Sequence, residues 1–150
     1  MSTLKYPNSG LINESLHTLL NITKVQYKKL SNLDGIRWIC EDALKFIEKN
    51  AFKDRKYDFI IMDPPAFGRG AKGEKWQLEK KLDSLVKHAA MSLNPKGKLV
   101  LNTYSPKIDQ GKTDAILSMY FKKFDTMQLV SKTTTGKKLE FGLVSYCELT

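Results

Sequence analysis

The sequence contains few of the residues that bind metals or form covalent cross-links. Its 150 residues include only two cysteines, Cys40 and Cys147, and two histidines, His17 and His88. The cysteines have no C-x-x-C partner and no neighbouring histidine pair, so the pattern favours no zinc site. Both lie in apolar, strand-like runs, and we expect buried thiols in a reducing compartment. The histidines have no visible catalytic partner, and we assign them no chemistry.

Long hydrophobic runs are also missing. No apolar stretch approaches the roughly 20 residues that a membrane-spanning helix requires, and no secretory leader pattern opens the chain. The 25 Lys and Arg against 16 Asp and Glu give a net charge of +9. That balance favours polyanionic partners such as RNA or DNA, although lysine-rich surfaces also serve solubility. We therefore expect a single cytoplasmic domain with no membrane contact and no metal.

Hydrophobic periodicity predicts an α/β domain. The expected strands are apolar runs, and they lie at 36–40, 57–63 and 98–103. The expected helices have apolar residues at helical spacing or an acidic first turn, and they lie at 12–30, 41–50, 78–93 and 112–124. The chain closes with a predicted hairpin whose turn is at Gly136. Alternating strands and helices that end in an antiparallel pair predict a mixed sheet.

The segment DPPAFGRGAKG, residues 63–73, joins a predicted strand to a predicted helix. Its glycines match G-x-G-x-x-G at Gly68, Gly70 and Gly73, a pattern that in dinucleotide-binding proteins turns the chain directly off the strand. Here five residues, two of them proline, separate the strand from the first glycine. A nicotinamide-dependent enzyme is therefore ranked below the other interpretations.

The start of this segment has the composition of a binding loop. Asp63 leaves the strand into Pro64 and Pro65, which keep the loop stiff. A stiff loop with Asp63 at one end and Phe67 at the other can hold a polar group and stack a planar one, as a nucleobase requires. The competing interpretation is a strand cap followed by a core phenylalanine.

Other polar residues are expected at the same edge, because ligands of open α/β sheets gather beyond the carboxyl ends of the strands. Asp42 follows the first predicted strand, where it can contact adenine or ribose or simply cap the next helix. Asn102–Pro106 follows the third. Arg69 and Lys72 make the glycine-containing loop cationic, and we expect phosphate contacts there unless the loop is merely solvated.

Four segments together resemble the class I S-adenosylmethionine-dependent methyltransferases: IRWICEDALKFIEK, YDFIIMDPPAFGRGAKGEKW, LNPKGKLVLNTYS and GKKLEFGLVSYC. The most similar group is the bacterial type related to the ribosomal-RNA cytosine-C5 methyltransferases, and the resemblance covers residues 33–148. It implies a Rossmann-like fold with a mainly parallel sheet, a carboxyl-terminal antiparallel hairpin and S-adenosylmethionine as cofactor.

The resemblance also assigns roles to residues at the sheet edge. It implies that Asp42 and Ala43 contact the cofactor, and that Asp63 lies at the methyl-transfer site and also touches the cofactor. Pro64, Pro65 and Phe67 are implied to line the same catalytic pocket. The expected substrate-binding residues are Arg69, Lys72 and Tyr104.

Two features depart from the resemblance. The glycine-rich cofactor loop and the acid that ends the family's second strand should precede Ile36, but residues 1–35 contain only Gly10 and Gly35 and show no strand, loop, helix, strand pattern. We therefore expect 1–150 to be a single partial domain, with a divergent helical segment at 1–35 and a methyltransferase-like core at 36–150. The strand at 36–40 must then pair directly with that at 57–63, find another neighbour, or pair across a dimer.

The second departure concerns the nucleophile. Cytosine-C5 transfer needs a thiolate, and relatives carry a cysteine in the loop after the fifth strand. This chain has Tyr104 and Ser105 in that loop, so we do not expect cysteine-dependent chemistry.

The leading hypothesis is an S-adenosylmethionine-dependent methyltransferase that acts on RNA, ribosomal RNA before others. The alternative is a non-catalytic basic module that binds nucleic acid and has lost the cofactor. RNA is the expected partner, with a second copy or a complementing chain also considered.

Overall fold

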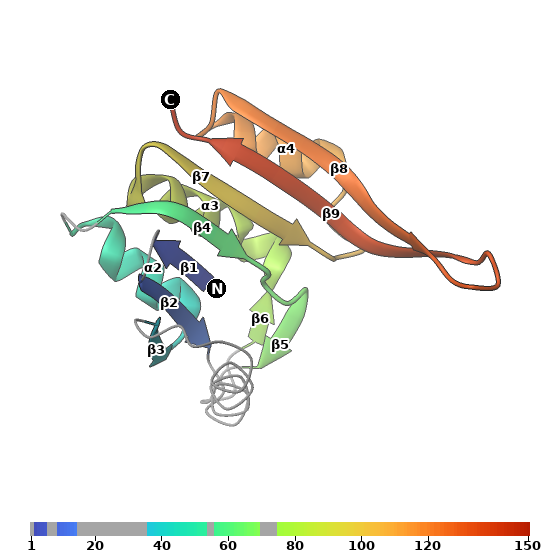
Figure 1. The fold of residues 1–150 in the computed structure, drawn as a ribbon, viewed down its shortest axis with the longest axis horizontal. Helices are drawn as coiled ribbons and strands as arrows, with labels where there is room; N and C mark the ends of the chain where they lie inside the picture. Colours follow the sequence, from blue (N-terminus) through green and yellow to red (C-terminus); the bar gives the residue numbers. More distant parts are fainter. Residues whose placement is uncertain (1, 6–8, 15–35, 54–55, 70–74) are drawn as a thin grey trace.

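The computed structural model describes residues 2–5, 9–14, 36–53, 56–69 and 75–150. These residues form a seven-stranded sheet, a two-stranded hairpin and three helices (Figure 1). The strands of the large sheet are β1 (Ser2–Lys5), β2 (Ser9–Glu14), β3 (Ile36–Cys40), β4 (Tyr57–Met62), β7 (Leu93–Thr103), β8 (Lys123–Lys132) and β9 (Lys138–Glu148). The hairpin is made of β5 (Phe67–Arg69) and β6 (Lys75–Gln77), and the helices are α2 (Ala43–Ala51), α3 (Leu78–Ser92) and α4 (Gln110–Ser118).

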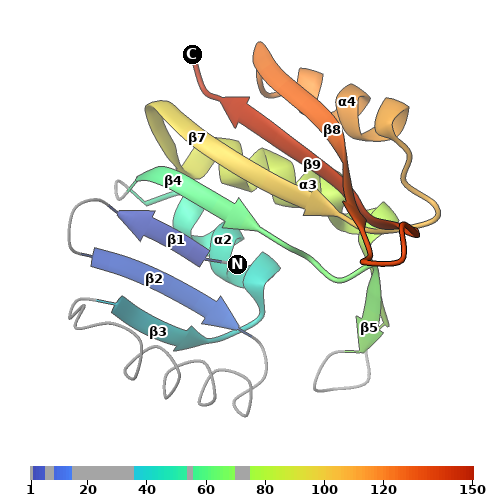
Figure 2. The ribbon, with the colours of Figure 1, turned by 45° about the vertical axis from the view of Figure 1, so that its right-hand side comes forward.

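The strand order of the large sheet is β3-β2-β1-β4-β7-β9-β8. Strand β2 is parallel to β3, and β4 is parallel to β7, whereas β1 is antiparallel to both β2 and β4. Strands β2, β3, β4 and β7 therefore run in one direction, and their carboxyl ends share one edge of the sheet (Figure 2). The expected mixed α/β sheet with a carboxyl-terminal antiparallel hairpin is confirmed.

The amino-terminal segment differs from the expectation. Residues 12–14 belong to β2, so the predicted helix at 12–30 is wrong over its first three residues; residues 15–35 lie outside the described part. Strands β1 and β2 also lie within the segment 1–35 that was expected to be helical. The physical reason is pairing: β2 has β1 on one side and β3 on the other, and these backbone hydrogen bonds override a local periodicity that suggested a helix.

The neighbour of β3 is therefore settled. Strand β3 does not pair directly with β4 but has another neighbour, β2. The two strands pair from Gly10 opposite Ile36 to Glu14 opposite Cys40. Strands β2 and β1 separate β3 from β4, so β3 completes its pairing within one chain.

The helix at the end of the core is shorter than its pattern suggested. It was expected at 112–124, but α4 ends at Ser118. The amides of Tyr120 and Phe121 then bond to the Leu117 carbonyl at 3.0 and 2.9 Å. This tight turn buries Phe121 and allows β8 to begin at Lys123, because sheet pairing with β9 competes with further helix.

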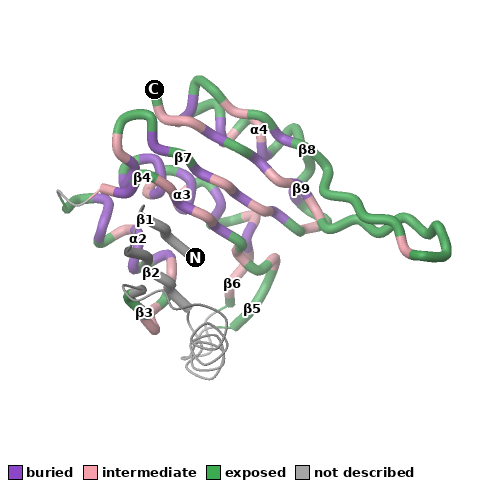
Figure 3. The backbone as a smooth tube through the Cα atoms, viewed as in Figure 1, coloured by how far each residue is buried: buried purple, intermediate pink, exposed green. Residues whose placement is uncertain are grey.

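The core lies on one face of the sheet. Helices α2, α3 and α4 all cover the same face (Figures 1 and 2). Alternate strand residues such as Ile60, Leu99 and Leu101 point into this layer and are buried, whereas Val100 and Val144 on the opposite face are half-buried. Figure 3 shows this alternation along β7, and it shows the outer half of the β8–β9 hairpin exposed. Within the described ranges no helix is long and apolar enough to cross a membrane.

Candidate functional site

A side-chain hydrogen bond joins the carboxyl ends of β4 and β7. Asn102 Nδ2 donates to Asp63 Oδ1 over 2.8 Å. Asp63 directly follows β4 and is exposed, so its carboxylate is held in position while it remains accessible. The Asn102 Oδ1 atom is buried and has no hydrogen-bond partner among the described atoms. Sequence reasoning placed Asn102 in a candidate loop but gave it no role, because the pairing of β4 with β7 is not visible in the sequence.

The proline loop is fastened to the start of α3. The Pro65 carbonyl accepts from Trp76 Nε1 at 2.6 Å, and the Ala66 carbonyl accepts from the Leu78 amide at 3.0 Å. Trp76 lies in β6 and packs against the core. Its role was missed, since no spacing rule connects it to the prolines. These two bonds hold the backbone that follows Asp63.

Two aromatic side chains are exposed in the segments that follow Asp63 and Asn102. Phe67 is 80% exposed at the start of β5, and Tyr104 is 62% exposed just after β7. The competing interpretation of Phe67 as a core residue is therefore wrong, because the β5–β6 hairpin carries it away from the helices. Each ring follows one of the two strand ends that Asp63 and Asn102 join. An acid and two exposed rings at the ends of neighbouring strands suit a planar polar ligand.

The glycine-containing segment is partly a hairpin rather than a loop. Gly68 lies in β5 opposite Trp76, and Arg69 lies opposite Lys75. Gly68 therefore does not make the strand-to-helix turn of a dinucleotide site, which removes the structural basis of that interpretation. Arg69 and Lys75 are exposed cations. Lys72, Gly70 and Gly73 lie outside the described residues.

Asp42 caps α2. Its Oδ1 accepts from the Lys45 amide at 2.9 Å, and Ala43 is the first residue of the helix. Asp42 is exposed, so the cap leaves it accessible. Strand β3 is three positions from β4 in the sheet, which at about 4.8 Å per strand places Asp42 about 14 Å from Asp63. The structure thus brings Asp63, Phe67 and Tyr104 to neighbouring strand ends and leaves Asp42 farther along the same edge.

Replacing Asp42 by alanine should remove the cap and lower the free energy of unfolding by about 1 kcal/mol. Asp42→Asn should keep most of that stability, because asparagine caps helices equally well. Urea denaturation of both variants checks the cap. If the cofactor needs the carboxylate itself, Asp42→Asn will weaken cofactor binding at near wild-type stability; equal losses of stability in the two variants would contradict the capping role.

The amino-terminal half of this edge is only partly as expected. Strand β2 ends in an acid, Glu14, which is paired with Cys40; the expectation that no acid ends a strand before Ile36 is therefore wrong. Only residues 6–8 connect β1 to β2. Three residues are too few for a glycine-rich loop followed by a helix. The short connection explains why β1 runs antiparallel to its neighbours.

Neither cysteine follows β4 or β7, the strands whose ends carry Asp63 and Asn102. Cys147 is buried in β9 opposite Leu99, and burial together with Asp114 raises the pKa of its thiol to about 12. Cys40 is half-buried at the end of β3. Both are thiols, and the loop after β7 carries Tyr104 and Ser105 instead. In the described ranges no group of three His, Cys, Asp or Glu residues is arranged to hold a metal ion.

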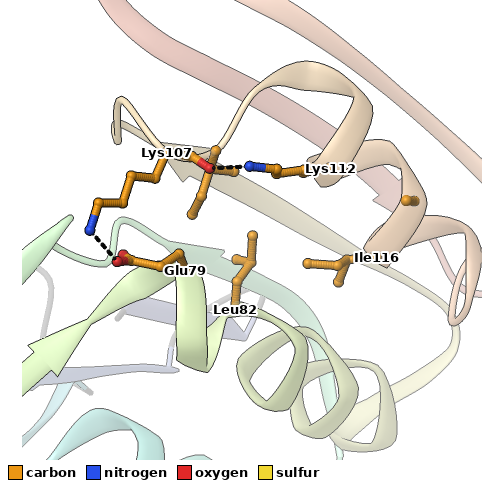
Figure 4. Close-up of a pocket in the computed structure, with 7 residues that line it drawn as sticks. Glu79, Leu82, Lys107, Lys112 and Ile116 are labelled. Atoms are coloured by element: carbon orange, nitrogen blue, oxygen red, sulfur yellow. Dashed lines mark hydrogen bonds and ion pairs between the residues drawn. The ribbon is translucent and has the colours of Figure 1, made fainter.

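A separate cavity of about 560 Å³ lies between α3 and α4 (Figure 4). Its lining residues are Glu79, Leu82, Lys107, Ile108, Lys112, Ala115 and Ile116. Lys107 Nζ pairs with Glu79 at 3.0 Å, and this hydrogen bond lowers the pKa of the Glu79 carboxyl. Lys112 Nζ donates to the Lys107 carbonyl at 2.9 Å. None of the predicted site residues lines this cavity, so it is distinct from the Asp63 site.

No protein-family model matches the sequence, and no curated protein matches it. Solved structures do. An S-adenosylmethionine-dependent methyltransferase from Agrobacterium tumefaciens superposes with a TM-score of 0.81 and 29% identity over 93% of this chain and 49% of its own length. A Streptococcus mutans structure assigned to the same class gives a TM-score of 0.68 at 13% identity, over 93% and 38% of the two chains.

Human methyltransferase-like protein 13, in complex with SAH, gives a TM-score of 0.57 at 20% identity, over 93% of this chain and 60% of its own. The chain spans about half the length of the Agrobacterium protein and less of the Streptococcus protein. Its strand order, carboxyl-terminal hairpin and these structural neighbours show that the chain has the Rossmann-like fold of class I S-adenosylmethionine-dependent methyltransferases.

Proposed function

We propose that the chain is a methyltransferase domain that uses S-adenosylmethionine and acts on RNA, with ribosomal RNA as the first candidate. The observation that carries the proposal is the Asp63–Asn102 pair at two neighbouring strand ends, each followed along the chain by an exposed aromatic residue, Phe67 or Tyr104. The likeness to the Agrobacterium methyltransferase supports the cofactor. The ribosomal cytosine-C5 group remains only a resemblance in sequence.

The residues in the segments next to the Asp63–Asn102 pair favour RNA as the substrate. Proteins that bind single-stranded nucleic acid combine cations for the phosphates with aromatic rings on which bases stack. Phe67 and Tyr104 are such rings, and Arg69 and Lys75 are exposed cations on the adjacent hairpin. The net charge of +9 provides long-range attraction for a polyanion. Lys72 remains a predicted phosphate contact.

The cofactor would extend along the carboxyl edge, with Asp42 and Ala43 toward its adenine and Asp63 toward its methyl. Glu14, at the end of β2, is an additional candidate for the ribose. The cofactor supplies an electrophilic methyl group. Pro64 and Pro65 stiffen the loop, Asp63 accepts a hydrogen bond from the acceptor group, and Phe67 stacks on the base. Holding the acceptor in line with the methyl group provides most of the rate, as in other reactions that depend on orientation.

The test has a matched control in the same strand. Asp58, in β4, accepts a hydrogen bond from Asn94 just as Asp63 accepts one from Asn102. With labelled S-adenosylmethionine and ribosomal RNA as substrates, Asp63→Ala should reduce methyl transfer about 100-fold, because the acceptor is no longer oriented. Asp58→Ala should leave transfer within about twofold, because that pair is not at the carboxyl edge. Equal activity of wild type and Asp63→Ala would reject the assigned role.

Binding of the cofactor separates the enzyme from the alternative, the non-catalytic RNA-binding module. The short β1–β2 connection removes hydrogen bonds that a glycine-rich loop would make, each worth about 1 kcal/mol. Calorimetric titration with S-adenosylmethionine distinguishes the two. Saturable binding supports the enzyme, whereas RNA binding without cofactor binding up to millimolar concentration supports the module.

A further inference from the structure

The face of the large sheet that is opposite the helices is uncovered by any described helix (Figure 1). Parallel sheets are generally covered on both faces. The outward residues at the centre of this face are largely apolar: Phe59, Ile61, Val100, Met127, Val144 and Tyr146. Tyr146 is 52% exposed and Met127 is 47% exposed. We call these six residues the open face.

Further large apolar side chains are exposed on the β8–β9 hairpin. Eleven large hydrophobic residues are exposed in the described part of the chain, and six of them lie on β8 and β9. Besides Met127 and Tyr146 they are Leu129, Val130, Leu139 and Phe141. Exposed apolar surface beyond scattered single residues marks association sites in soluble proteins. The position and the extent of this surface both point to a protein partner.

The charged residues next to the open face are balanced in sign. Lys98, Lys123, Asp125 and Glu148 line a hollow of about 310 Å³ together with Tyr146. Two lysines and two acids sum to zero, in a chain whose net charge is +9. A polyanion needs an excess of cations, so this face does not suit RNA. A protein surface with equally balanced charges meets no net electrostatic repulsion at this face.

Two of these charges have no ion-pair partner within the described structure. Lys123 and Glu148 pair with each other at 3.2 Å, whereas Lys98 and Asp125 have no such contact. Lys98 lies on β7 opposite Glu148 of β9, and Asp125 lies on β8 opposite Tyr146 of β9, so the two charges lie diagonally across β9. Two strand spacings across the sheet and two residues along the strands place the two charges about 12 Å apart. Lys98 and Asp125 are therefore two charges of opposite sign on either side of β9, near the exposed ring of Tyr146, and they do not pair with each other.

A two-fold axis through this point satisfies both charges at once. An isologous interface places residue i against residue j, and j against i. If the axis lies between the two faces, parallel to the sheet and crossing β9 near Tyr146, Lys98 meets Asp125 of the partner subunit, and Asp125 meets Lys98 of the partner subunit. The two open faces then pack at about the 10 Å spacing of stacked sheets. The hollow beside Tyr146 receives Tyr146 of the partner subunit.

We propose that the open face forms the interface of a two-fold dimer of this chain, centred on Tyr146. The dimer does not depend on the proposed methyltransferase activity. It covers the apolar surface that the helices leave exposed.

Charge reversal tests the arrangement. In sedimentation equilibrium, the wild-type chain should dimerise in the micromolar range. Lys98→Asp should weaken the dimer about tenfold or more, because two repulsive contacts replace two attractive ones, and Asp125→Lys should do the same. The double variant K98D/D125K should restore the wild-type dissociation constant, because each pair is again of opposite sign.

Val144→Lys at the centre of the open face should give a monomer, with circular dichroism to verify the fold. Phe52→Lys is the matched control, since Phe52 is 77% exposed but follows α2, away from this face; it should leave the dimer intact. A wild-type chain that stays monomeric at submillimolar concentration overturns the proposal. So does a double variant that fails to restore association when both single variants have lost it.

Discussion

Gly142→Ala is expected to destabilise the protein by about 3 kcal/mol or more, the range of substitutions that force backbone atoms apart. Gly142 has φ of 89°, and a Cβ atom there would lie 2.3 Å from the Thr103 carbonyl oxygen and 3.0 Å from Tyr104 Cα. Both contacts are with backbone, so no rotamer change relieves them. The end of β7 must separate from β9, which also displaces the loop that carries Tyr104.

Gly136→Ala provides the matched control. Gly136 has φ of 83°, but a Cβ atom there meets nothing within 4 Å. Alanine then adds only the cost of the left-handed conformation, about 1 kcal/mol. Urea denaturation of both variants measures the difference in the free energy of unfolding. Equal losses in the two variants would show that the contact with Thr103 is not the cause.

Leu99→Ala is expected to lower the free energy of unfolding by about 2 to 5 kcal/mol, as buried leucines do. Leu99 is 0% exposed at the centre of β7, where it lies opposite Ile60 on one side and Cys147 on the other. Removing three carbon atoms there leaves a cavity between the sheet and the helices. Thermal or urea denaturation measures the loss.

Val100→Ala, the adjacent substitution, tests whether the core is one-sided. Val100 is half-buried on the open face, so its truncation should cost about 1 kcal/mol. The comparison should be made at a protein concentration that keeps the chain monomeric, because the dimer would bury Val100 further. A loss at Val100 as large as at Leu99 would indicate a second layer over the open face within the chain.

The local patterns of the sequence predicted most of the region from β3 onward. The apolar run that became β4, the stripe of α3 and the turn at Gly136 each depend on interactions between near neighbours in sequence. The position of Asp63 after a strand was predictable for the same reason. Asp63 and Tyr104 are both exposed, and their roles in the site stay predictions.

The patterns failed where distant segments pair. Pairing between strands decided that α4 ends at Ser118 and that residues 9–14 form a strand. The partner strands are either distant in sequence or joined by a short connection, and local patterns reveal neither. The Asn102 bond to Asp63 spans 39 residues, and the Trp76 bond to Pro65 depends on the β5–β6 hairpin. Such contacts follow from topology rather than from spacing along the chain.

The sequence by itself determined which residues are apolar, where the chain turns, and that an acid and two prolines follow a buried strand. Only the tertiary structure decided that β1 is reversed, that all described helices cover one face, and that Asn102 holds Asp63. The reason is that local conformation depends on neighbouring residues, whereas strand order depends on the net free energy of packing the whole sheet.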